Sequence, residues 1–208
     1  PIYLAFDLDS KEACEALVTT NKVIVAGEVK SNAEINVEKI VRETIEKIGY
    51  TDSKIKFSAN ECEVSSLIHS QSEDINRGVE KSVKENQGAG DQGIMFGYAC
   101  RETSELMPLP IALAHQLTRK HEALRQNRSL GLRPDAKSQV AVEYNDNYQP
   151  QRIDSIVFSS QHDPDLSLEQ LRELVREEII YKTLPQDLID DKTKFFINPA
   201  GRFEIGGP

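Results

Sequence analysis

Two stretches of the chain show the same order of predicted elements: a β-hairpin, an amphipathic helix and a further strand. The first occupies residues 13–57 and the second residues 139–197. Hairpins that alternate with helices indicate an α+β fold in which the helices cover one face of each sheet. The shared order also indicates a structural repeat, although the two sequences do not visibly match. We therefore expect repeated α+β units, each built on an antiparallel or mixed sheet.

In the first stretch, two short apolar runs within residues 13–29 predict the hairpin. A helix is predicted next, with Asn36 as its N-cap and Gly49 as its stop. Its apolar residues recur at helical spacing: Val37, Ile40, Val41, Ile45 and Ile48. Residues 54–57 then predict a strand, whereas residues 64–69 fit either a strand or a helix.

The second stretch is preceded by a predicted helix at residues 109–125. Alternating polar and apolar residues within 139–159 predict a second hairpin. Ser167 and Gln170 match a capping box at the start of a further helix. One face of that helix is apolar: Leu168, Leu171, Leu174, Val175 and Ile179. The segment KFFINP predicts the last strand.

The composition is that of a soluble globular protein, with 38% hydrophobic and 28% charged residues in 208. No apolar run reaches the roughly 18–20 residues that span a bilayer. The net charge of −9 argues against a nucleic-acid surface, which usually carries a basic stripe. We therefore expect a cytoplasmic protein with no nucleic-acid or membrane partner, and its three cysteines are interpreted as reduced, mostly buried thiols.

The segment GAGDQG, residues 88–93, matches the glycine pattern of dinucleotide-binding proteins, but its context differs. That fingerprint follows a strand and opens a helix, whereas here polar residues precede it and a predicted strand, residues 94–100, follows. The glycines allow close approach to a ligand, and Asp91 could accept from an ammonium group or bind a metal. A tight turn is the alternative. Residues 71–87 predict a long loop, either a functional lid or a surface connector.

Two other segments carry side chains suited to a nucleotide. In a predicted loop at residues 133–139, Lys137 could contact a phosphate and Asp135 a ribose hydroxyl. Arg202 lies beside Phe203, a pair that suits a phosphate and a stacked base. In each case an ordinary surface loop or turn is the alternative.

Glu15 and Glu28 interrupt apolar strands of the first hairpin. If those strands pair, each carboxylate must face solvent, a partner or a ligand, because burying it unpaired is costly. His162 is interpreted as structural. No serine–histidine–aspartate arrangement, paired metal-binding histidines or two-cysteine motif is present, so the residues alone predict no more than a nucleotide site.

Taken together, these segments resemble one family, the S-adenosylmethionine synthetases (methionine adenosyltransferases). They occur in the order found in that family and cover essentially the whole chain. The most specific are GAGDQG-x-MFGYA and FFINP-x-GRF-x-IGGP. The others are ACEALVTT, VAGEV, QSEDIN, LMPLPIALAHQL, LRPDAKSQV and SSQH.

The resemblance implies an enzyme that joins methionine to ATP. The methionine sulfur attacks C5′ of the ribose, and the released triphosphate is cleaved to phosphate and diphosphate. Catalysis then depends mainly on positioning and on stabilising the charge of the leaving group. The family also implies Mg²⁺ and K⁺ as cofactors. Its active site forms between subunits, in a homodimer or a dimer of dimers.

The resemblance also assigns roles to individual residues. The methionine-binding positions are Glu28, Gln71 and Asp91, and the ATP-binding positions are Asp135, Lys137, Arg202 and Phe203. Glu15 matches the carboxylate associated with potassium. Residues of about 71–87 correspond to a loop that gates the site. The implied division is a first α+β unit, residues 1–100, and a second, residues 101–208.

The chain also departs from the family pattern. The N-terminal His-Pro-Asp-Lys segment and the C-terminal portion, where the magnesium ligands are expected, are absent from these 208 residues. Smaller departures are Glu73, Arg77 and Ala200. We expect the 208-residue chain alone to be inactive. The alternative to an enzyme is a truncated, catalytically incompetent relative that binds nucleotide or pairs with a complete subunit.

Overall fold

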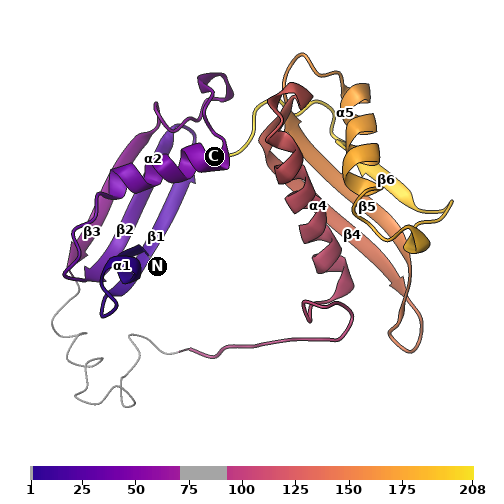
Figure 1. Ribbon diagram of the computed structural model, residues 1–208, viewed down its shortest axis with the longest axis horizontal. Coiled ribbons are helices and arrows are strands. Elements are labelled where there is room, and N and C mark those ends of the chain that lie inside the picture. Colours follow the sequence, from indigo (N-terminus) through magenta and orange to yellow (C-terminus); the bar gives the residue numbers. More distant parts are fainter. Residues whose placement is uncertain (1, 71–92) are drawn as a thin grey trace. The chain divides into compact units, whose positions relative to one another are not determined.

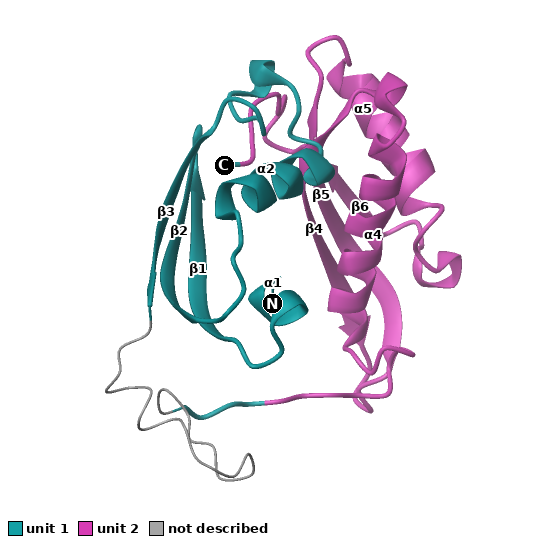
Figure 2. Ribbon diagram, turned by 60° about the vertical axis from the view of Figure 1, so that its left-hand side comes forward, with its two compact units in different colours: residues 1–96, 208 teal, residues 97–207 magenta. Residues whose placement is uncertain are grey.

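The computed structural model describes residues 2–70 and 93–208. The chain divides into two compact units, Pro1–Phe96 with Pro208, and Gly97–Gly207 (Figures 1 and 2). Among the described residues, no helix is long and apolar enough to cross a membrane. All three cysteines are free, but only Cys62 is buried, whereas Cys14 and Cys100 are half-buried.

The first unit is a mixed three-stranded sheet with helices on one face (Figure 2). Its strand order is β1-β2-β3, in which β1 and β2 are antiparallel and β3 is parallel to β2. Helix α2 packs over the sheet, and its Ile45 joins Val23 in a small core. The elements are α1 (Ile2–Phe6), β1 (Lys11–Thr19), β2 (Lys22–Lys30), α2 (Val37–Ile48), the 3₁₀ turn η1 (Ser53–Ile55) and β3 (Glu63–Ser70).

The predicted ends of helix α2 are confirmed. The Asn36 side chain accepts a hydrogen bond from the Lys39 N–H at 3.0 Å, which satisfies one of the free donors of the first turn. At the other end, Gly49 adopts the left-handed conformation with φ 105°, and its N–H donates to the Ile45 and Glu46 carbonyls. Both signals are local, which is why the sequence reveals them.

The strand predicted at residues 54–57 is wrong. Asp52 caps the turn η1, and Lys56 follows it with a φ of 62°, which no strand residue adopts. Ile55 and Phe57 are buried in the core of the unit instead of pairing with a strand. The ambiguous stretch at residues 64–69 forms the strand, β3.

The second unit repeats this plan around a larger core. Its sheet has the order β4-β5-β6, with β4 and β5 antiparallel and β6 parallel to β5. Helices α4 and α5 lie on the same face of the sheet (Figure 2). The elements are α4 (Leu109–Arg125), the 3₁₀ turn η3 (Arg128–Leu130), β4 (Leu132–Tyr144), β5 (Pro150–His162), α5 (Leu168–Leu174), the π-helical turn η4 (Val175–Ile180), the 3₁₀ turn η5 (Gln186–Leu188) and β6 (Lys194–Ile197).

Glu102, seven positions before the first residue of α4, caps the start of this helix. Pro108, at the N-cap, makes no side-chain hydrogen bond to the helix. Instead, the Glu102 carboxylate accepts from the Leu109 N–H at 3.0 Å and from the Tyr144 hydroxyl at 2.5 Å. These hydrogen bonds, the one from Tyr144 first, lower the pKa of Glu102. Glu102 therefore joins the start of α4 to the end of β4.

The predicted repeat and the α+β class are confirmed. In both units a helix precedes an antiparallel hairpin, a second helix follows, and the last strand adds in parallel to the second hairpin strand. The capping box at Ser167 is also present, with both reciprocal hydrogen bonds.

Two further predictions of local structure are wrong. Residues 94–100 form no strand, and Ile94, Met95 and Phe96 are more than 80% exposed. The sequence predicts a loop at residues 133–139, but they belong to β4. Pro134 fits there because β4 is an edge strand and its pairing with β5 is irregular between Leu132 and Ala136, where a missing N–H is tolerated.

Candidate functional site

Glu15 and Glu28 of the first unit lie on the sheet face opposite α2. Val23 and Val25 pack toward α2. Because side chains alternate between the two faces of a strand, Glu15 and Glu28 lie on the other face of the sheet. Glu28 is opposite Ala13, so Glu15 is its diagonal neighbour on β1. The adjacent strand adds His69, whose Nε2 lies 3.3 Å from Oε1 of Glu28. The two acids of the apolar strands therefore share one open face.

Gly27, immediately before Glu28, allows the two hairpin strands to approach closely. Its φ is 146°, and a Cβ built there would lie 2.1 Å from the carbonyl oxygen of Ala13. No side chain can be accommodated at that distance without moving the backbone. Gly27 is thus required for the strand pairing that sets Glu28 opposite Ala13.

In the second unit, the segment after β6 folds back along the start of β4 and the end of β5. Asn198 starts this return: its side chain pairs with the backbone N–H and carbonyl of Ser160, at 2.9 and 3.0 Å. Gly201 then turns the chain with a φ of 97°. This brings Gly206 and Gly207 beside Asp135, which lies 72 positions before Gly207 in the sequence.

Asp135 and Phe203 meet at this end of the sheet. Oδ2 of Asp135 accepts from the Gly207 N–H at 3.0 Å. A Cβ on Gly206 would lie 2.2 Å from Cε2 of the Phe203 ring and 3.0 Å from Oδ2 of Asp135. Only the absence of a side chain at Gly206 allows the ring and the carboxylate to lie on either side of it.

The two cations predicted for this site are placed differently. Arg202 is partly exposed and donates from Nε to the Glu204 carboxylate at 2.6 Å and from Nη2 to the Pro164 carbonyl at 2.6 Å. The pairing with Arg202 also lowers the pKa of Glu204. Lys137 is exposed on β4, two residues beyond Asp135.

A buried polar layer beneath Phe203 was not predicted as part of the site. The Arg133 guanidinium donates from Nη1 to the Glu204 carbonyl at 2.6 Å and pairs through Nε with Asp163 at 2.8 Å. Gln161 donates from Nε2 to the same Glu204 carbonyl at 3.0 Å. Both residues are buried. They fix the backbone just after Phe203.

His162 holds the backbone of Phe203 itself. It is fully buried, and its N–H donates to the Phe203 carbonyl at 2.9 Å. In return, the Phe203 N–H donates to Nε2 of the His162 ring at 3.1 Å. The structural role expected for His162 therefore consists of anchoring the segment that carries Phe203. In the sequence, only the position of His162 at the end of a predicted strand indicates this role.

A second buried histidine, His121 of α4, supports the same layer and was missed in the sequence. Its Nε2 lies 2.8 Å from Oγ of Ser160, which donates to the Gln161 carbonyl at 3.0 Å. Burial, together with the positive charge of Arg125, lowers the pKa of His121 to about 4. His121 is therefore neutral near pH 7.

Several predicted site features fall outside the described residues. These are Gln71, Asp91, the gating loop of about 71–87, and the departures Glu73 and Arg77. Among residues 2–70 and 93–208, no group of three or more His, Cys, Asp or Glu side chains could hold a metal ion. Glu15 is a single exposed carboxylate, which does not complete a metal site by itself.

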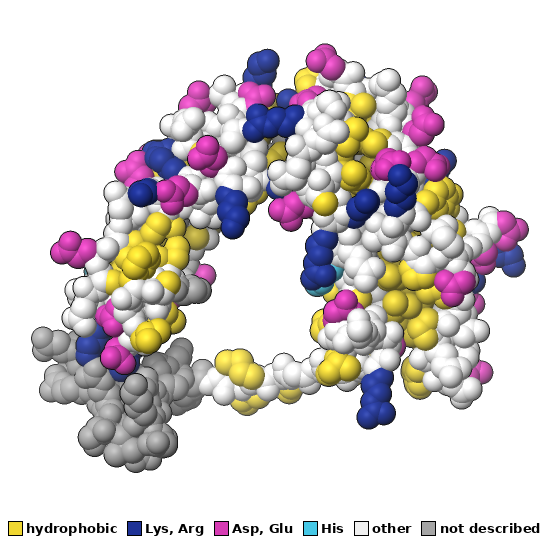
Figure 3. Space-filling model, viewed as in Figure 1, with side chains coloured by type: hydrophobic (Ala, Val, Ile, Leu, Met, Phe, Trp, Pro, Cys, Tyr) yellow, Lys and Arg dark blue, Asp and Glu magenta, His cyan; other side chains and the backbone are white. Residues whose placement is uncertain are grey.

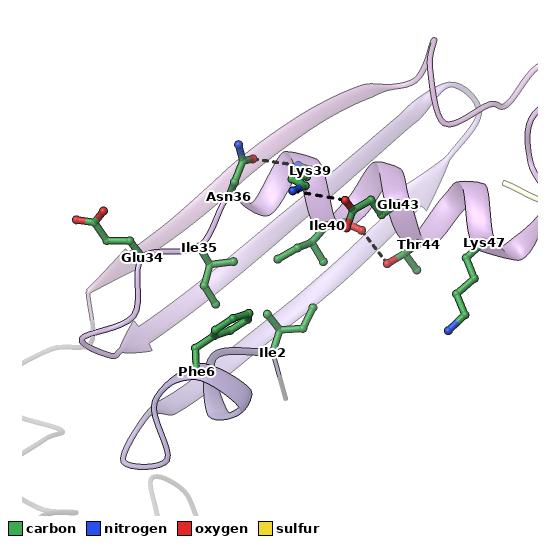
Figure 4. A pocket seen from close by; sticks show the side chains of 10 residues that line it. All are labelled: Ile2, Phe6, Glu34, Ile35, Asn36, Lys39, Ile40, Glu43, Thr44 and Lys47. Carbon is green, nitrogen blue, oxygen red and sulfur yellow. Dashed lines mark hydrogen bonds and ion pairs between the residues drawn. The ribbon is translucent and has the colours of Figure 1, made fainter.

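A groove of the first unit lies elsewhere and contains none of the predicted site residues. It has a volume of about 520 Å³ and lies between α1 and α2 (Figure 4). Ile2, Phe6 and Ile40 point into it, with Lys39 and Glu43 along α2. Figure 3 shows the hydrophobic side chains gathered on this side of the unit.

The comparisons with known proteins agree on one family. Residues 2–73 match the model of the S-adenosylmethionine synthetase N-terminal domain, and residues 86–203 match that of the central domain. The S-adenosylmethionine synthase of Myxococcus xanthus (strain DK1622) is 52% identical over 205 residues, which are 99% of this chain and 51% of that protein. The chain thus spans about half the length of the curated relative that it matches. The chain therefore belongs to the S-adenosylmethionine synthetase family.

Proposed function

We propose that this chain provides part of the active site of a methionine adenosyltransferase, which forms S-adenosylmethionine from ATP and methionine and cleaves the released triphosphate to phosphate and diphosphate. The observation that carries the proposal is the meeting of Asp135 and Phe203, beside Arg202, at one end of the second sheet. An aromatic ring, a carboxylate and a guanidinium are the groups that recognise a base, a ribose and a phosphate.

Each group has a distinct task. The Phe203 ring stacks on adenine, and Asp135 accepts from a ribose hydroxyl. Arg202 and Lys137 bind the phosphates. Two of the Arg202 N–H groups are used by Glu204 and Pro164, and a guanidinium has five, so further donors remain for a phosphate.

In the first unit, Glu28 is proposed to bind methionine, together with Gln71 and Asp91. A carboxylate on an open sheet face suits the methionine ammonium group, and the neighbouring His69 orients it. In the reaction, the methionine sulfur forms a bond to C5′ while the C5′–oxygen bond breaks and the triphosphate carries away the electron pair. No side chain of this chain is required as a nucleophile.

Mg²⁺ and K⁺ are the proposed cofactors, with Glu15 as one potassium ligand. Bound Mg²⁺ would neutralise the polyphosphate. Since the described residues assemble no complete metal site, no step is assigned to either ion. A cytoplasmic location and a homodimer or dimer of dimers, with the site between subunits, complete the proposal.

The experiment transfers the 205 aligned residues of this chain into the Myxococcus xanthus synthase and measures S-adenosylmethionine formation with ATP, methionine, Mg²⁺ and K⁺. We expect an active chimera in which Lys137→Ala weakens the use of ATP. Lys182→Ala is the matched control, because Lys182 pairs only locally with Glu178. A folded chimera that forms no S-adenosylmethionine would contradict the proposal and favour a non-catalytic, nucleotide-binding or subunit-pairing protein. The isolated 208-residue chain is expected to be inactive in the same assay.

A further inference from the structure

Each ring nitrogen of His162 has a hydrogen-bond partner that can act only as a donor or only as an acceptor, so the position of the ring proton is defined. The Phe203 backbone N–H can only donate, so Nε2 of His162 must be unprotonated. The Asp163 carbonyl, 2.9 Å from Nδ1, can only accept, so Nδ1 must carry the proton. His162 is thus a neutral imidazole in its Nδ1–H form.

His162, the last residue of β5, holds Phe203 by two hydrogen bonds. The backbone of His162 donates to the carbonyl of Phe203, and its ring accepts from the N–H of Phe203. These two hydrogen bonds hold both polar groups of one residue, so the direction of its Cα–Cβ bond is set. Gln161 and Arg133 hold the following carbonyl, that of Glu204.

We propose that His162 is a positioning residue for base recognition: through Nε2 it orients the Phe203 ring toward the adenine of ATP. The inference rests on the proposed function, in which Phe203 stacks on the base. It assigns no contact between His162 and ATP, since His162 is fully buried. The effect of changing His162 should therefore appear with ligands that contain the base and not with polyphosphate alone.

Two substitutions separate the two ring nitrogens. His162→Gln keeps an acceptor near the position of Nε2, whereas His162→Asn keeps a donor near Nδ1 and removes the acceptor for the Phe203 N–H. The dissociation constants of ATP and of inorganic tripolyphosphate are measured by calorimetry on the chimera with the Myxococcus xanthus synthase. We expect His162→Asn to raise the dissociation constant of ATP roughly fivefold, which is the effect of losing one hydrogen bond. In His162→Gln this constant should stay near the unsubstituted value. Tripolyphosphate binding should be unchanged in both.

An equal loss of affinity in the two variants, or an equal loss of affinity for ATP and tripolyphosphate, would overturn the positioning role. A general loss of structure would affect both variants and both ligands alike. Phe203→Ala distinguishes this inference from the proposed function. If Phe203→Ala weakens ATP binding and His162→Asn does not, only the role of His162 fails. If Phe203→Ala has no effect on ATP binding, or the unsubstituted chimera does not bind ATP, the proposed function fails with it.

A second measurement does not depend on the folding of any variant. Nitrogen-15 chemical shifts of the histidine rings report which nitrogen carries the proton. The expected spectrum assigns the proton of His162 to Nδ1 and leaves Nε2 as an acceptor. A proton on Nε2 would contradict the hydrogen bond on which the inference depends.

Discussion

The buried His121 makes the stability of the second unit depend on pH between about 4 and 6.5. In the folded chain its pKa is about 4, compared with 6.5 for an ordinary histidine. Between these values the unfolded chain binds a proton that the folded chain excludes, so stability rises with pH over this range. The contribution is fully present above about pH 6.5 and is lost as the pH falls toward 4.

The magnitude follows from the difference between the two pKa values, which is roughly 2.5 pH units. At about 1.4 kcal/mol for each pH unit, protonation of His121 costs about 3 kcal/mol of unfolding free energy by pH 4. The side chain is 2% exposed, so solvent screening does not reduce this figure substantially.

The assay is urea unfolding followed by circular dichroism at a series of pH values between 4 and 8. His121→Gln keeps a donor for the Ser160 hydroxyl but cannot titrate. We expect the difference in unfolding free energy between this variant and the unsubstituted chain to change by about 3 kcal/mol between pH 7 and pH 4. His115→Gln is the matched control, because His115 is exposed on the same helix. Parallel curves for His121→Gln and the unsubstituted chain would refute the reasoning.

Three further predictions concern single positions. Gly27→Ala should destabilise the first unit by about 2 kcal/mol or more, because the new Cβ meets the Ala13 carbonyl; an unchanged melting temperature would contradict this. Glu102→Ala should cost about 1 kcal/mol in urea unfolding through the lost cap of α4, whereas an equally stable variant would show that the cap is not needed. Gly206→Ala should displace the Phe203 ring and weaken ATP binding with little change in melting temperature, and equal affinity would show that the ring can move aside.

Elements whose determining interactions are local could be predicted from the sequence. The caps at Asn36 and Ser167 join residues three positions apart, and both were predicted. Prediction from the sequence fails where tertiary structure decides. Residues 54–57 alternate like a strand, yet their apolar side chains enter the core from a turn. Residues 94–100 have strand-like composition, but no strand among the described residues pairs with them.

The candidate site shows the same division. The resemblance indicated Asp135 and Phe203, and the structure brings them together through the turn at Asn198. The buried residues that hold this arrangement, Gln161 and His121, were not predicted. Their partners lie 43 and 39 positions away in the sequence, so no local pattern identifies them.

The central claim is that the base of ATP stacks on the Phe203 ring, and nuclear Overhauser effects test it most directly. The chain is labelled at phenylalanine and saturated with ATP. We expect contacts from the adenine H2 and H8 protons to the ring protons of Phe203, and none to Phe196, whose ring is exposed on β6. Adenine contacts to Phe196 alone, or no contact to Phe203 in a chain that binds ATP, would contradict it.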